Sequence, residues 1–340
     1  AGVGSFFFIA MAPWLAGTML KAPHLTIALM VGAGFIFFSS INGYQTGALS
    51  GLEAYGGLAK AGVASGIVAV AAISLGAWLG GLNGTLLGLS ISAFVRCTIH
   101  NRWLRVESRV QGIKPQYRGS LSQEKAVIRN FALPAAIAGY YSMPMIWLAS
   151  SFLVRQPGGY GEMALYGAAN KLRILVLFLP NVMNSVGLSV LNYEKAKGDV
   201  NHYNQVFKSN VFYIFLVSLG GAFIIGIFGR PILHLFGKDF GAAYNLLSIL
   251  LVASLFEGVS IALYQYVQSK AKIWLSFFSI NLPREAFLVM AAHYLVQSYG
   301  GVGLAAAYLG STILGLIFNL YLVVMLYRKE GKVLVSCTVR

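Results

Sequence analysis

Ten apolar windows follow one another along this chain, and each is long enough to cross a lipid bilayer as a helix. A helix needs about 20 apolar residues to span a hydrocarbon core of about 30 Å. Only 10% of the 340 residues are charged, against about 25% in an average soluble domain. The chain therefore lacks the polar material for a water-exposed surface, and the sequence predicts an all-α, polytopic membrane protein. The windows are roughly 1–20, 25–50, 58–79, 82–100, 130–154, 160–190, 208–229, 241–267, 272–297 and 302–327.

Basic residues are distributed unevenly among the connections between these spans. The longest connection, 101–129, carries seven lysines and arginines. If it is cytoplasmic, alternation of the spans puts 18 of the 25 cations on the cytoplasmic side, four on the other side and three inside spans. Cytoplasmic loops of membrane proteins collect Lys and Arg. This bias accounts for the net charge of +15 without a nucleic-acid partner, and predicts that both ends of this chain are cytoplasmic.

Two regions of the chain resemble each other at an offset of roughly 215 to 220 residues. Each contains a short outer turn with paired glycines, Gly80-Gly81 and Gly300-Gly301, followed by one span and a basic inner end. Parallel internal repeats of this kind occur in several transporter folds. The first four spans therefore look like counterparts of the last four.

The two spans at 130–154 and 160–190 have no upstream counterpart in this repeat. The simplest account is a protein of twelve helices in two six-helix lobes whose first two helices are absent from this chain. We then expect the remainder of an N-terminal lobe with four spans at 1–105, a basic cytoplasmic linker at 106–129, a C-terminal six-helix lobe at 130–328 and a cytoplasmic tail at 329–340.

Three cations lie inside predicted spans: Lys171, Arg173 and Arg284. At 100° per residue, a polar face runs along the whole span 160–190, while Lys171 points about 160° away from Arg173. Arg173 lies some 20 Å below the outer end at 1.5 Å per residue. A cation at that depth costs about 2.5–3.5 kcal/mol, so other groups must compensate its charge. The polar face consists of Glu162, Tyr166, Asn170, Arg173, Pro180, Asn181 and Asn184.

Two arrangements satisfy this requirement, and they can hold for different residues. One is an ion pair with a carboxylate of another span, for which Glu257 and Glu285 are the candidates. The other is a hydrated cavity shared by the bundles, because other spans, including that of Asn42, also carry polar stripes. Three cations against two carboxylates leave such a cavity positive. It would suit an anionic ligand, above all a phosphate, since Arg matches phosphate oxygens.

Sequence patterns of a membrane enzyme are missing. Asp199 and Asp239 are isolated, the five histidines have no ligand spacing, and Cys97 and Cys337 provide no disulfide framework. All outer connections are short, whereas outer-leaflet polymerases and ligases need a sizeable external domain. We expect a protein that is not an enzyme and has no catalytic residues, metal ion or cofactor.

Five stretches together resemble a known family, the polysaccharide repeat-unit flippases of the multidrug/oligosaccharidyl-lipid/polysaccharide exporter superfamily. The resemblance covers essentially the whole chain in order, and its specificity lies in the set of diffuse motifs. The stretches are ALSGLEAYGGLAK (48–60), FALPAAIAGYYSMPMIWLASSFLV (131–154), GEMALYGAANKLRILVLFLPNVM (161–183), LFGKDFGAAYNLLSILLVA (235–253) and NLPREAFLVMAAHYLVQSYGGVGLAAAY (281–308).

The resemblance implies a MATE-like fold and a flippase of the bacterial inner membrane that moves undecaprenyl-diphosphate-linked oligosaccharide by alternating access, for O-antigen or exopolysaccharide synthesis. Its partners would be that lipid, the bilayer, a polysaccharide polymerase and a chain-length regulator. Glu257 and Glu285 would tune the cations or carry a coupling proton. A multidrug exporter of the same superfamily and a lipid II flippase are the alternatives. The substrate-binding residues would be Arg173, Arg284, Lys171, Asn170, Tyr166, Asn181 and Asn42.

Overall fold

The computed structural model describes residues 2–19, 23–113 and 125–338, and within these ranges the regular structure is entirely helical. Lys21, Lys114 and Arg118, which contribute to the charge bias, lie outside the described residues. The predicted all-α membrane fold is confirmed. The chain divides into two compact units, Ala1–Gly119 and Ser120–Arg340, with the boundary inside the stretch 106–129.

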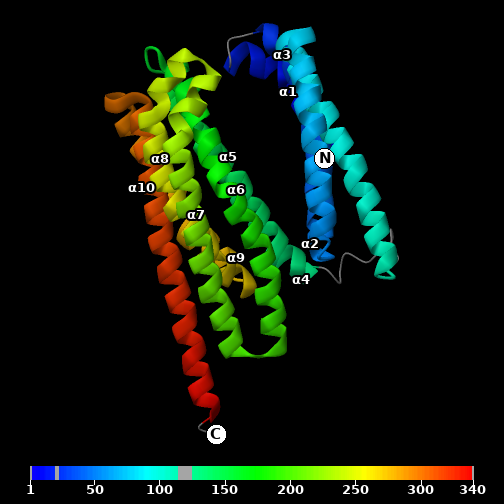
Figure 1. Ribbon diagram of the computed structural model, residues 1–340, viewed down its shortest axis with the longest axis vertical. Coiled ribbons are helices and arrows are strands. Elements are labelled where there is room, and N and C mark those ends of the chain that lie inside the picture. Colours follow the sequence, from blue (N-terminus) through cyan, green and yellow to red (C-terminus); the bar gives the residue numbers. More distant parts are fainter. Residues whose placement is uncertain (1, 20–22, 114–124, 339–340) are drawn as a thin grey trace. The chain divides into compact units, whose positions relative to one another are not determined.

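Unit 1 is built from three main helices, drawn from blue to cyan in Figure 1. Helix α1 (Gly2–Trp14) continues into the π-helical turn η1 (Leu15–Met19), and η2 (Pro23–Leu25) leads into α2 (Thr26–Gly51). Helix α3 follows at Tyr55–Val110. Helix α2 packs against both α1 and α3.

Unit 2 holds the remaining helices, drawn from green to red in Figure 1. Helices α6, α7 and α8 pack against one another in pairs, and α10 packs against α5, α6 and α8. The elements are α4 (Lys125–Val127), η3 (Ile128–Ala132), α5 (Leu133–Val154), α6 (Gly159–Lys197), α7 (Val200–Phe236), η4 (Lys238–Ala243), α8 (Tyr244–Ser269), α9 (Ile273–Ser276), η5 (Phe277–Asn281) and α10 (Leu282–Thr338).

Seven helices of the described chain are long and apolar enough to cross a membrane, and the shorter apolar helix Gly2–Gly17 precedes them. Two of the seven, Tyr55–Val110 and Ile273–Arg328, have 56 residues each. A straight helix of that length would measure about 84 Å, far more than one crossing requires. Both are interrupted at the predicted glycine turns, since Gly81 has φ 54° and ψ −132° and Gly300 has φ 53° and ψ −132°.

The chain reverses direction at each of these glycines. A Cβ atom on Gly76 would lie 2.2 Å from the carbonyl oxygen of Gly84, and one on Gly303 would lie 2.2 Å from that of Leu295. The segments before and after each break are therefore antiparallel helices in close contact. Small residues permit such an approach between membrane helices.

The turns that the sequence predicts to be inner repeat as closely as the glycine turns, which it predicts to be outer. Glu53, after α2, and Ala271, after α8, both have positive φ angles of 55° and 54°, although neither is a glycine. Their amides donate to the carbonyl oxygens of Ser50 (3.1 Å) and Gln268 (2.9 Å). Both the turn residues and their acceptors are 218 positions apart. The matching backbone confirms the internal similarity that the sequence predicts.

The offset between the two repeats increases by one residue between these turns and the glycine turns. Gly300 follows Gly81 by 219 positions, whereas Ala271 follows Glu53 by 218. Between the two turns, unit 2 contains the π-helical turn η5 (Phe277–Asn281), and the matching part of α3 is regular α-helix. A π-helical turn holds one more residue than an α-helical turn. Turn η5 therefore accounts for the change of offset.

The glycine turn of unit 1 provides a test of this geometry. Gly81→Ala places a β-carbon on a backbone with φ 54°, although nothing lies within 4 Å of it. We expect the free energy of unfolding to fall by about 1–3 kcal/mol from backbone strain alone. Gly80→Ala is the matched control, because Gly80 has φ −139° and open space around its Cβ position. Denaturation of the two purified variants in detergent checks this, and equal stability would contradict it.

Candidate functional site

Only part of the predicted polar face of α6 packs inside unit 2, because Glu162 and Asn181 are exposed and Asn181 lines the same groove as Lys171. Helix α6 lies between Gly158 and Gly198, and both glycines have the left-handed conformation that favours glycine at a helix end. Arg173 and Tyr166 on this face are each only 8% exposed. The sequence leaves two arrangements open for this face, an ion pair with another span and a cavity between bundles. For Arg173 the structure shows the ion pair, among the helices of its own unit.

Arg173 is the centre of a buried network that joins three helices. Its guanidinium forms an ion pair with Glu257 of α8, the candidate partner in the sequence. The same group donates to the Tyr308 hydroxyl of α10 (2.7 Å) and to Asn170 Oδ1 (2.8 Å). The Tyr308 hydroxyl donates in turn to Glu257 Oε2 (2.9 Å), and the Tyr308 ring lies 4.5 Å from the Arg173 Cζ atom. The network neutralises and orients the cation.

A second ion pair lies within α10. Arg284 pairs with its sequence neighbour Glu285, whose side chain is 2% exposed, while the Arg284 side chain remains 32% exposed. The aliphatic part of the Arg284 side chain packs against Gly315. A Cβ atom added to Gly315 would lie 2.8 Å from Arg284 Cδ. Arg284 therefore reaches a partly open space although its charge is compensated.

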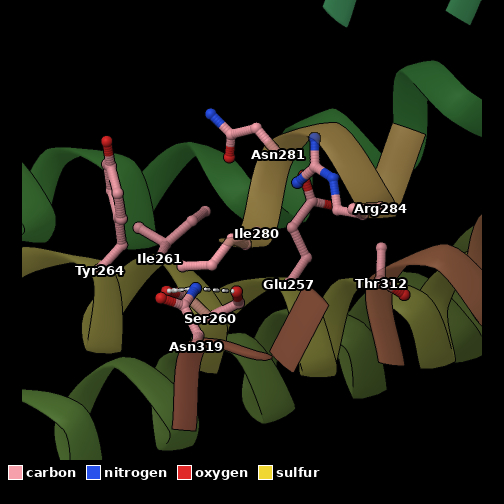
Figure 2. A pocket seen from close by; sticks show the side chains of 9 residues that line it. All are labelled: Glu257, Ser260, Ile261, Tyr264, Ile280, Asn281, Arg284, Thr312 and Asn319. Carbon is pink, nitrogen blue, oxygen red and sulfur yellow. Dashed lines mark hydrogen bonds between the residues drawn. The ribbon is translucent and has the colours of Figure 1, made fainter. Parts of the chain in front are cut away.

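That space is a pocket of about 200 Å³ among α8, η5 and α10 (Figure 2). Glu257 and Arg284 both line it, so the pocket touches both ion pairs. Its other polar groups are amides and hydroxyls. The lining residues are Glu257, Ser260, Ile261, Tyr264, Ile280, Asn281, Arg284, Thr312 and Asn319.

Lys171 lies on the opposite, exposed side of α6. It borders an open groove of about 500 Å³ whose polar members at the other end are Asn181 and Ser185, with an apolar middle that includes Phe178. Among the described residues, no carboxylate forms an ion pair with Lys171. Asn181 donates to the Leu177 carbonyl oxygen of its own helix (2.8 Å).

Asn42 has a structural contact within unit 1. Its side-chain amide donates to the Ala93 carbonyl oxygen (3.0 Å), and Asn42 is 7% exposed. It thereby joins α2 to the second half of α3. This is the kind of interhelical hydrogen bond that polar side chains make in membranes.

Three contributors in unit 2 were not assigned these roles from the sequence. Tyr308 and Asn319 share a face of α10 with Thr312, at spacings of four and seven residues from it, and this spacing is the signal that could have found them. Glu162, on the predicted polar face, accepts a hydrogen bond from the Gly301 amide. Its carboxylate therefore lies at the start of the last helical segment, where the helix dipole favours negative charge.

Within the described ranges, no group of three or more His, Cys, Asp or Glu side chains lies close enough to hold a metal ion. The candidate site therefore consists of ion pairs, amides and hydroxyls. Such an arrangement binds and orients polar groups.

Solved structures of MATE transporters have the same fold. An outward-facing multidrug resistance MATE family transporter of the MOP superfamily matches with TM-score 0.75 and 18% identity, over 96% of this chain and 76% of that one. An inward-facing one matches with TM-score 0.68 and 16% identity, over 95% and 78%. A Vibrio cholerae MATE transporter variant matches with TM-score 0.70 and 14% identity, over 97% and 76%.

No protein-family model matches the chain, and no curated protein matches it. At the identities above, the structural comparison shows the fold: a polytopic helical membrane protein built like the MATE transporters. The proteins with this fold named here are transporters and not enzymes.

The Arg173–Glu257 pair is open to a double-mutant test. Arg173→Met and Glu257→Gln each leave one charge unpaired inside the bundle, which typically costs about 3–5 kcal/mol of stability. The double variant removes both charges, and we expect it to lose clearly less than the sum of the single losses. Denaturation of the purified variants in detergent measures this coupling, and simple additivity would contradict the ion pair.

Proposed function

We propose that this protein moves a lipid-linked oligosaccharide carrying a diphosphate across the bacterial inner membrane. Its transporter fold supports a transport role. Lys171 carries the more specific part of the proposal, because it lies about 18 Å from the start of α6 and no described carboxylate pairs with it. An ionisable residue at such a depth marks a functional site by default. The missing counter-charge is what an anionic substrate would supply.

The groove beside Lys171 fits an amphiphilic anion. It combines a cation at one end, the apolar side chains of Ile174, Leu175 and Phe178 in the middle, and the polar groups of Asn181 and Ser185 beyond them. A diphosphate would pair with the Lys171 ammonium while a polyprenyl chain stays among apolar surfaces. A fully water-soluble anion would gain no binding energy from the apolar part of the groove.

Arg173 and Arg284 have different parts in this proposal. Arg173 is buried and neutralised, so it positions Glu257 and Tyr308 and does not touch the substrate. Arg284 keeps a partly exposed guanidinium beside Glu285, and it borders a pocket that Glu257 also lines. A phosphate there would meet the Glu257 carboxylate, so Arg284 would contact an uncharged polar part of the substrate.

Transport would proceed by alternating access, with the headgroup bound from the cytoplasmic side and released on the other. The polymerase and chain-length regulator of polysaccharide synthesis would be the partners that use the product. Glu257 and Glu285 would hold the cations in place between cycles.

A multidrug exporter is the second candidate, and one observation favours it. The two ion pairs of unit 2 cancel the positive surplus that Arg173 and Arg284 would otherwise provide. A neighbouring solved structure is described as a multidrug resistance transporter. An exporter of organic cations has no need of Lys171, so this residue separates the two candidates.

Complementation in a strain that lacks its own repeat-unit flippase tests the proposal. We expect Lys171→Met to lower surface polysaccharide at least tenfold at normal membrane abundance, because the diphosphate loses its counter-charge, and Lys171→Arg to retain most of it. Lys272→Met is the matched control, since Lys272 is exposed next to the inner turn. Surface polysaccharide is measured by blotting.

Full activity of Lys171→Met would remove the basis of the proposal. If the wild-type chain restored no polysaccharide but increased resistance to cationic drugs, the exporter would be the better assignment.

A further inference from the structure

We infer that the pocket among α8, η5 and α10 is a subsite for one neutral, hydroxyl-rich sugar ring. This inference deepens the proposed flippase function and rests on it for its biological role. It concerns a site inside unit 2 that is distinct from the groove beside Lys171.

The charges around the pocket favour a neutral ligand. Glu257 and Arg284 line the same space of about 200 Å³ (Figure 2). Each is already paired, Glu257 with Arg173 and Arg284 with Glu285. A bound cation would meet the Arg284 guanidinium, and a bound anion would meet the Glu257 carboxylate. A ligand with both donors and acceptors but no net charge avoids both penalties.

Asn319 and Ser260 fix one side of the pocket. Asn319 is 3% exposed, and its amide nitrogen donates to the Ser260 carbonyl oxygen (3.2 Å) and to Ser260 Oγ (2.7 Å). These two side chains are held by each other. The Asn281 amide and the Tyr264 hydroxyl therefore remain as polar lining groups for the hydroxyls of a ligand.

The shape of the lining fits one ring. Tyr264, Ile261 and Ile280 give the pocket an apolar side and an aromatic ring, against which the C–H face of a sugar can pack. Figure 2 shows the Asn281 amide above Ile280, between Tyr264 and Arg284. Sites for drug-sized ligands measure about 300–1,000 Å³. The smaller pocket admits a single six-membered ring.

Comparison of the repeats indicates that the fold itself does not require this pocket. Ser260 corresponds to Asn42 at the offset of the inner turn, and Thr312 corresponds to Ala93 at the offset of the outer turn. In unit 1 the Asn42 amide spans the space between the two helices and donates to the Ala93 carbonyl oxygen. In unit 2 the side chain of Ser260 is shorter, and the matching space between the helices is part of the pocket.

The inserted residue of η5 adds to the difference. It belongs to the same turn as Ile280 and Asn281, which line the pocket. Pro283, two positions after Asn281, has no amide hydrogen to donate, which is a common cause of irregular helical turns. Single π-helical turns within helices are frequent at functional sites.

Saturation-transfer NMR on the purified full chain in lipid nanodiscs tests this inference. The probes are glucose, galactose and N-acetylglucosamine, with sodium ions and inorganic phosphate as rival ligands. We expect at least one sugar to bind and its affinity to fall about tenfold in Asn281→Leu, which removes one hydrogen-bonding group. Asn201→Leu, the same change at an exposed position in the first turn of α7, should leave it unchanged. Melting temperatures of the variants verify that they fold.

Each outcome is decisive. No binding of any sugar, equal binding in Asn281→Leu, or displacement of sugar by sodium or phosphate would overturn the subsite. Sugar binding that survives in a protein unable to restore polysaccharide would leave the subsite standing while the flippase proposal fails. Restored polysaccharide without sugar binding would support the flippase proposal and overturn the subsite.

Discussion

A guanidinium inside a bilayer must be neutralised, and the packing of unit 2 depends on how Arg173 meets this requirement. The ion pair with Glu257 and the hydrogen bond to Tyr308 connect three helices that are distant in sequence. A buried pair contributes little net stability compared with apolar residues of the same volume, but it is costly to break. The network therefore fixes which faces of α6, α8 and α10 meet, and so determines that Lys171 is on the exposed side of α6.

The membrane fold could be read from the sequence because its causes are local. The length of the apolar windows predicts the spans, and the paired glycines predict two of the turns, at Gly81 and Gly300, where the helices break. Glu257 was a candidate partner because spans of this chain contain few carboxylates. The side of α6 that faces its own bundle could not be derived. A helical wheel relates Arg173 to Lys171, but only the neighbouring helices determine which of them is buried.

The two repeats show how one backbone accommodates different chemistry. In unit 1, Arg96 of the second helical segment of α3 donates to Ser65 of the first (3.2 Å). At the offset of the glycine turn these positions correspond to Gly315 and Arg284 in unit 2, where the arginine comes from the opposite segment. A guanidinium and a small residue thus occupy the same helix contact in both units. In unit 2 the arginine borders a pocket, where Ser260 takes the place of a larger amide.

The most direct measurement is transport by the purified full chain in liposomes loaded with a short-chain polyprenyl-diphosphate oligosaccharide. Periodate added outside oxidises only the sugars of the outer leaflet. The account predicts that the protein makes the protected inner fraction accessible, and that an uncharged polyprenyl glycoside moves far more slowly because it offers no counter-charge to Lys171. The account would be contradicted if the inner fraction stayed protected in vesicles where the same protein exchanges an organic cation such as ethidium.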